Sequence, residues 1–137
     1  MSEGDFPDIE GGFRDWLRTQ TDVQAVVGNR VWFGIPDNPD FPLIVVSRAG
    51  GTDDTSEAAI DRAFMRFDCW SAGRDKATAR AVANALRRAL HSIRGSTALN
   101  SSVVAYGAEV IADLWQPDTD SDQPRYVLTV DVTARAA

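Results

Sequence analysis

Apolar side chains near the start of the chain recur at the spacing of a helix that is buried on one side. This pattern covers Ile9–Leu17 and predicts a first helix with Asp8 as its N-cap. A second, shorter helix is expected over 22–27, where Thr21 is suited to the cap and Gly28 to a left-handed end. The N-terminal region is therefore predicted to be helical and broken once.

The strongest helical period in the sequence covers residues 75–93. Gly95 follows its end and is suited to the left-handed conformation that terminates a helix. The apolar stripe consists of Ala79, Val82, Ala85, Leu86, Ala89, Leu90 and Ile93. This segment is therefore predicted to be the main helix.

Strict alternation of apolar and polar residues predicts the strands. The clearest strand is 62–70, with one face made of Ala63, Met65, Phe67 and Cys69. Four further strands are expected over 30–33, 43–48, 103–115 and 125–133. Gly107 marks a bulge in the third of these four. Polar and turn-forming residues predict loops over 49–56, 95–102 and 116–124.

The order of these elements is α, β, β, β, α, β, β, with the broken N-terminal region counted as one helix. It predicts an α+β fold, in which an antiparallel or mixed sheet of about five strands packs against two helices. The second face of strand 62–70 mixes Phe64 and Trp70 with charged residues, which suits a face covered by a helix or a neighbouring subunit. We find no repeat or linker, so residues 1–137 are expected to form one domain, with 1–8 as a flexible arm.

Composition narrows the possible chemistry. A chain of 137 residues with 44% hydrophobic content can form a core without a disulfide or a structural metal. Its one cysteine, Cys69, lies in an apolar strand and is expected to be an inert buried thiol, and its one histidine, His91, to be an exposed helix residue. No catalytic residue, cofactor or metal is assigned, so an enzyme is the least favoured class. The acidic N-terminus has no signal-peptide pattern, and no apolar run is long enough to indicate a membrane partner.

The charge of the chain is unevenly distributed. The formal net charge is −6, yet residues 74–94 hold six basic residues and only one acid. Arg80, Arg87 and Arg94 fall on the outer face of the main helix, where an ordinary solvated face and a docking face for an acidic partner both fit. Specific nucleic-acid binding is less favoured, because no aromatic residues are interleaved with these arginines.

Other exposed features have two interpretations each. The acids Asp53, Asp54 and Glu57 in one loop, and Asp118, Asp120 and Asp122 in another, lack the spacing of a calcium loop, so we expect solvated side chains. Trp70 and Trp115 each end a long strand beside a polar loop. They fit equally a lid on the core and an anchor at an interface.

Several segments form one ordered pattern along the chain: VVGNRVW at 26–32, the proline-rich 36–42, IVVSRAGG at 44–51, RFDCW at 66–70, the alanine-rich 77–90 and RYVLTVDVT at 125–133. In order and spacing this pattern resembles that of the tail terminator (tail completion) proteins of long-tailed bacteriophages. Together the segments span nearly the whole chain from Ile9 onward.

The resemblance implies a non-enzymatic virion protein that forms a hexameric ring at the head-proximal end of the tail and is assembled in the host cytoplasm. Its partners would be further copies of itself, the tail tube protein and a head connector protein, with DNA passing through the ring without specific binding. The three arginines, Trp70 and Trp115 would then be interface residues, and the six loop acids would repel phosphates in the channel. A head–tail connector or neck protein and a small α+β ligand-binding module remain as alternatives.

Overall fold

A computed structural model describes residues 6–53 and 60–137, with only the backbone described at Thr52 and Asp53. Its helices are α1 (Ile9–Leu17), α2 (Thr21–Val27) and α3 (Lys76–His91). The strands are β1 (Val31–Trp32), β2 (Leu43–Asp53), β3 (Asp61–Trp70), β4 (Arg94–Ala98), β5 (Val103–Trp115) and β6 (Arg125–Ala136). No helix in these ranges is long and apolar enough to cross a membrane.

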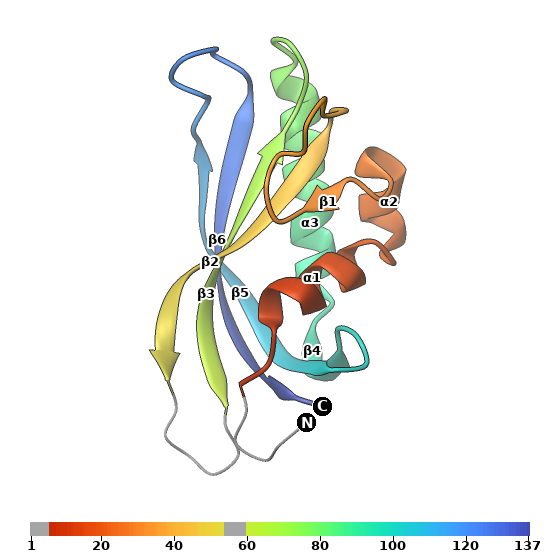
Figure 1. Cartoon of the computed structure of the whole chain (residues 1–137), viewed down its shortest axis with the longest axis vertical. Coiled ribbons are helices and arrows are strands. Elements are labelled where there is room, and N and C mark those ends of the chain that lie inside the picture. Colours follow the sequence, from red (N-terminus) through yellow and green to blue (C-terminus); the bar gives the residue numbers. More distant parts are fainter. Residues whose placement is uncertain (1–5, 54–59) are drawn as a thin grey trace.

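The strands form one mixed sheet in the order β1-β2-β3-β6-β5-β4. β1 runs parallel to β2, and every other neighbouring pair is antiparallel. The helices lie on one side of this sheet and leave the other side open (Figure 1). The predicted α+β class is therefore confirmed, with β4 as a strand beyond the five expected.

The start of α1 follows the predicted capping chemistry, whereas the start of α2 differs from the prediction. The Asp8 side chain accepts a hydrogen bond from the Gly11 backbone N–H at 3.1 Å, so Asp8 is the N-cap of α1 as predicted. α2 begins one residue earlier than expected, because Gln20 occupies the cap position in place of Thr21. Gly28 ends this helix with a positive φ of 58°, which favours glycine.

The core lies between the helices and the face of β3 that alternation predicted. Phe67 is fully buried, and the Phe13 ring of α1 packs edge-on against it with ring centroids 5.3 Å apart. Cys69 is on the same face, and burial raises the pKa of its thiol, as expected for an inert cysteine. The predicted faces of β3 are thus confirmed.

Two predicted loops are partly strand. β2 continues from the expected 43–48 as far as Asp53, because glycines here let two backbones approach. At Gly51 the φ is +143°, and a Cβ atom would lie 2.3 Å from the Arg62 carbonyl oxygen of β3. All of β4 except its first residue, Arg94, falls within the expected loop 95–102. It is an edge strand with mostly exposed side chains, so no apolar alternation marked it.

An ion pair joins β2 to β3 in the part of their ladder that contains Asp61, the first residue of β3. The Arg48 Nη2 donates to Asp61 Oδ1 at 2.7 Å, and the Asp61 side chain is only 2% exposed. The Arg48→Met variant would leave that carboxylate buried and unpaired, so we expect a loss of about 3 kcal/mol in unfolding free energy by urea titration. Arg48→Lys keeps a cation there and is expected to lose less. Equal losses in the two variants would contradict a role for this charge.

Candidate functional site

Two of the predicted interface arginines on α3 share an acidic partner within the chain. Arg80 donates to Asp113 of β5 through both of its terminal nitrogens, at 3.2 and 2.6 Å. Arg87 reaches the same carboxylate at 3.2 Å. The hydrogen bond to Asp113 raises the pKa of Arg80, since it stabilises the charged guanidinium. Asp113 is therefore a partner that sequence reasoning did not identify.

Two further basic side chains, Arg88 and Arg94, lie exposed beside these pairs, and we call them the basic rim. Arg94 begins β4, and its Nη2 lies 2.8 Å from the Nε2 of His91, which is exposed as expected. Arg88 pairs with Asp22 of α2 at 3.3 Å, but both side chains are more than half exposed, at 59% and 57%. Such exposed pairs contribute little stability and exchange readily with other partners. The rim can therefore meet an acidic surface without a large loss inside the subunit.

A stack of aromatic and cationic side chains links α3 to the ends of β5 and β6. Lys76 Nζ lies 4.4 Å from the ring centroid of Trp115, and Arg80 Cζ lies 4.2 Å from that of Tyr126. The two aromatic centroids are 5.1 Å apart. Trp115 remains 41% exposed at the end of its strand, so part of its ring is open to a neighbour.

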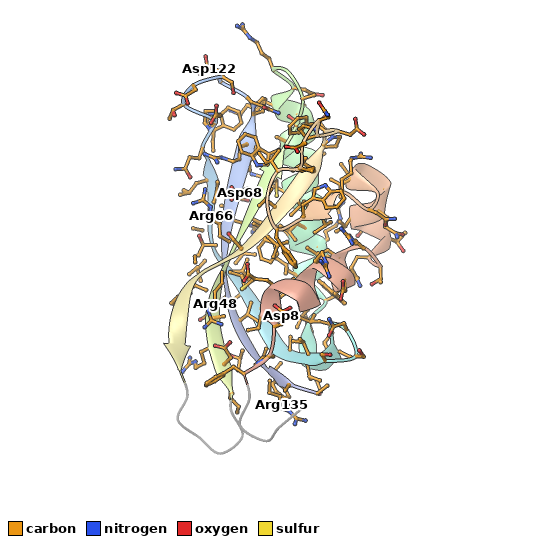
Figure 2. All side chains as sticks on the ribbon, viewed as in Figure 1. Asp8, Arg48, Arg66, Asp68, Asp122 and Arg135 are labelled. Carbon is orange, nitrogen blue, oxygen red and sulfur yellow. The ribbon has the colours of Figure 1, made fainter. Side chains whose placement is uncertain are left out.

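Trp70 is largely buried, although it lies outside the main core cluster and on the open side of the sheet. It is 6% exposed, and the Arg125 guanidinium lies 4.6 Å from its ring centroid. Asp68 holds Arg125 at 3.6 Å and Arg66 at 2.7 Å, and Arg66 and Asp68 are marked in Figure 2. Little of the Trp70 ring is therefore exposed in the isolated subunit, and its role at an interface stays a prediction.

The outer edge of β5 is the most exposed apolar part of the sheet. β4 pairs with β5 only as far as Gly107, so among the described residues 108–115 have no strand partner on that side. Ile111 and Leu114 on this edge are 52% and 56% exposed. Two register shifts, beside Gly107 and at Ile111, each change the alternation of side chains between the two faces of β5. Simple alternation in the sequence therefore could not identify which residues of this strand are exposed.

The backbone of Asp53 and the acidic loop 116–124 lie at opposite ends of the sheet. Asp54 and Glu57 lie outside the described residues, and Asp53 is described only as the backbone end of β2. The loop 116–124 joins β5 to β6 at the opposite end, where Figure 2 marks Asp122. Asp120 and Asp122 are exposed, and Asp118 accepts hydrogen bonds from the backbone and hydroxyl of Ser121. Among the described residues no group of acids, histidines and cysteines could hold a metal ion.

The N-cap of α3 gives the protein an acid-sensitive contact. Hydrogen bonds from the side chain and the backbone of Thr78 lower the pKa of Asp75 below its usual 3.8. A lowered folded pKa stabilises the fold above the ordinary pKa, and this contribution is lost as the pH falls through the folded value. We expect Asp75→Ser, which keeps a cap that cannot ionise, to reduce the fall in Tm between pH about 6 and about 3.

The matched control for this variant is Asp40→Ser. Asp40 is exposed and makes no hydrogen bond with the described residues, so its removal is expected to leave the pH dependence of Tm unchanged. If Asp75→Ser kept the wild-type pH dependence while Asp40→Ser reduced it, the assignment would be contradicted.

A groove runs between α3 and the unpaired part of β5. Its volume is about 480 Å³. It is lined by Arg87, Arg88, Leu90, His91, Ala108, Glu109 and Val110. Its floor is aliphatic and its rim is charged, which is typical of a surface that receives another protein. The lining therefore supports the binding of another protein.

Comparison with known proteins agrees with this description. The sequence pattern of the family described as tail completion protein gp17 matches residues 13–136. A chain from the virion of a native gene transfer agent particle has a similar fold, with a TM-score of 0.66 and 21% sequence identity. The match covers 93% of this chain and 94% of that one. No curated protein matches the sequence.

The family match extends from α1 to the end of β6 and so includes the groove, the β5 edge and the acidic loop. Only residues 1–12 and residue 137 lie outside the match. The resemblance drawn from the segments of the sequence is thereby confirmed. The chain belongs to the tail completion protein gp17 family, whose members are structural proteins of phage tails.

Proposed function

We propose that the protein is a tail terminator: a hexameric ring that caps the finished tail tube, stops its polymerisation and joins the tail to the head connector. The observation that carries this proposal is the match of the tail completion family to nearly the whole chain, residues 13–136. We infer that the chain forms one folded unit and that its work lies in the surfaces of that unit. The ring would be seated at the head-proximal end of the virion tail.

The one-sided packing of the sheet supports a role in assembly. All helices cover the same face, so the open face and the sheet edges remain available to other proteins (Figure 1). Exposed apolar side chains concentrate along the β5 edge and beside β1. Clusters of this kind on a small protein are typical of interaction sites.

The distribution of charge supports a channel that DNA crosses without binding. We infer that Asp118, Asp120 and Asp122 line the channel at one end of the subunit, and that Asp53, Asp54 and Glu57 do so at the other. Carboxylates on the wall would repel phosphates and keep DNA from adhering during ejection. The exposed basic rim at Arg94, together with Arg80 and Arg87, would face away from the channel toward an acidic protein surface.

Negative-stain microscopy of the purified protein mixed with tail tubes tests this function. We expect rings seated on one end of each tube. Protein found only on portals or head connectors would instead favour a neck protein of the same virion. Stoichiometric binding of a small molecule in the groove, with no particle on tubes or connectors, would favour a ligand-binding module and overturn the proposal.

A further inference from the structure

Five exposed large apolar side chains lie at two opposite edges of the sheet, whereas Phe64 lies on the interior strand β3. β1 lies at one edge of the strand order, and Phe33 and Ile35 follow it directly with 46% and 49% exposure. β5 borders the other edge, where Ile111 and Leu114 are 52% and 56% exposed. The two groups belong to different surfaces of one subunit, and each leaves apolar area in contact with water.

The segment beside β1 is fixed in place at both ends. Arg18 donates to the Val31 carbonyl at 2.7 Å before it, and Arg30 Nε donates to the Pro42 carbonyl at 2.8 Å after it. The Arg14 guanidinium also lies 4.6 Å from the ring centroid of Phe33. A segment held in this way loses little conformational entropy when it docks. It can therefore act as a preformed projection.

The β5 edge has the features of a receiving surface. Its backbone from 108 to 115 is unpaired on the outer side among the described residues, and the groove against α3 opens beside it. Natural proteins usually protect such an edge with charges or a covering element. Here three of the four exposed positions in 108–115, namely Ile111, Leu114 and Trp115, are apolar and only Glu109 is charged, which indicates an edge that is covered in the assembled state.

The charges of the two surfaces are complementary. The β1-side segment 33–42 contains Asp37 and Asp40 and no basic residue, and neither acid has an ion pair among the described residues. The groove rim carries Arg87 and Arg88 against one lining acid, Glu109. Within the subunit Arg87 pairs with Asp113 and Arg88 with Asp22, but the two arginines remain 47% and 59% exposed and so stay open to a second acidic partner. An apolar and acidic projection thus matches an apolar and basic groove, and this complementarity sets orientation and register.

We propose that the β1-side segment of one copy, through Phe33 and Ile35, docks on the β5 edge and the α3 groove of the next copy. The contact is head-to-tail, because each subunit offers two different and complementary surfaces. A heterologous contact of this type closes into a ring when the rotation between subunits permits it. This inference rests on the proposed ring and assigns the surfaces that build it.

Thiol cross-linking of the full chain tests the contact. Ile35→Cys and Leu114→Cys are each placed on about half-exposed positions, and the native Cys69 is buried and unreactive. A short bis-maleimide should give covalent dimers, of twice the 14.9 kDa subunit mass, only when the two variants are mixed. The double variant should give a ladder of higher products. Ile35→Cys mixed with Phe64→Cys, an exposed position away from both edges, is the matched control and should give no product.

The outcomes separate this contact from the proposed function. Dimers formed by either single variant alone would show a symmetric contact and overturn the inference, as would a mixture that gives no more product than the control pair. If the mixture fails while rings still cap tubes, only the assignment of surfaces is lost. If the ladder forms but no particle is found on tube ends, the contact stands and the terminator function falls.

Discussion

Replacing Phe67 with alanine is expected to lower the free energy of unfolding by about 3–5 kcal/mol, as for other fully buried aromatic residues. Phe67 has no exposed surface, and its ring packs against Phe13 of α1. It lies on β3, where β2 and β6 pair on either side at Val46 and Leu128, so the surrounding backbone cannot collapse into the cavity. Urea titration followed by circular dichroism measures the loss.

The control for this variant lies three residues earlier in the same strand. Phe64 is on the open face and is 40% exposed, so Phe64→Ala removes the same atoms from a site that water already reaches. We expect a cost of about 1 kcal/mol there. Equal costs at Phe64 and Phe67 would mean that the buried face of the sheet is assigned incorrectly.

Combining Ile111→Asp with Leu114→Asp is expected to abolish self-association while leaving the subunit folded. Both side chains are more than half exposed in the isolated subunit, so the new carboxylates remain hydrated and Tm should change little. Inside the proposed contact the same carboxylates would lose water and meet a segment that carries two further acids, Asp37 and Asp40, which costs several kcal/mol. Analytical ultracentrifugation measures the oligomer, and a thermal melt measures the fold.

Phe64→Arg is the control for assembly. It also replaces an exposed apolar side chain with a charge, and Asp131 lies opposite it on β6, so the local fold should accept the change. This variant should retain the wild-type oligomer. Loss of assembly in Phe64→Arg with retention in the β5-edge variant would place the subunit contact on the open face instead.

Much of the fold was predictable because burial on one side leaves a period in the sequence. α3 and β3 are confirmed in place and in the face that they bury, and the Asp8 cap follows from local hydrogen bonding. β4 was missed because its exposed side chains carry no period, and the extension of β2 because its glycines also fit a turn. Both elements depend on pairing with distant strands, which local sequence does not report.

The candidate site was less predictable for a related reason. The basic face of the main helix was visible in the sequence, but Asp113 was not, because two register shifts in β5 change which side chains face α3. Trp70 and Trp115 have similar local contexts, yet Arg125 and the surrounding strands cover only the first. Local pattern thus predicted which residues are charged or aromatic, while the tertiary contacts decided which of them remain exposed.

Seeded growth of tail tubes measures termination itself. Short tubes are mixed with tube protein, and the lengths are measured by microscopy with and without the purified protein. We expect tubes to stop growing at the protein-bearing end and each stopped end to carry one ring. Tubes that grow equally long in the presence of the folded, assembled protein would contradict the terminator function.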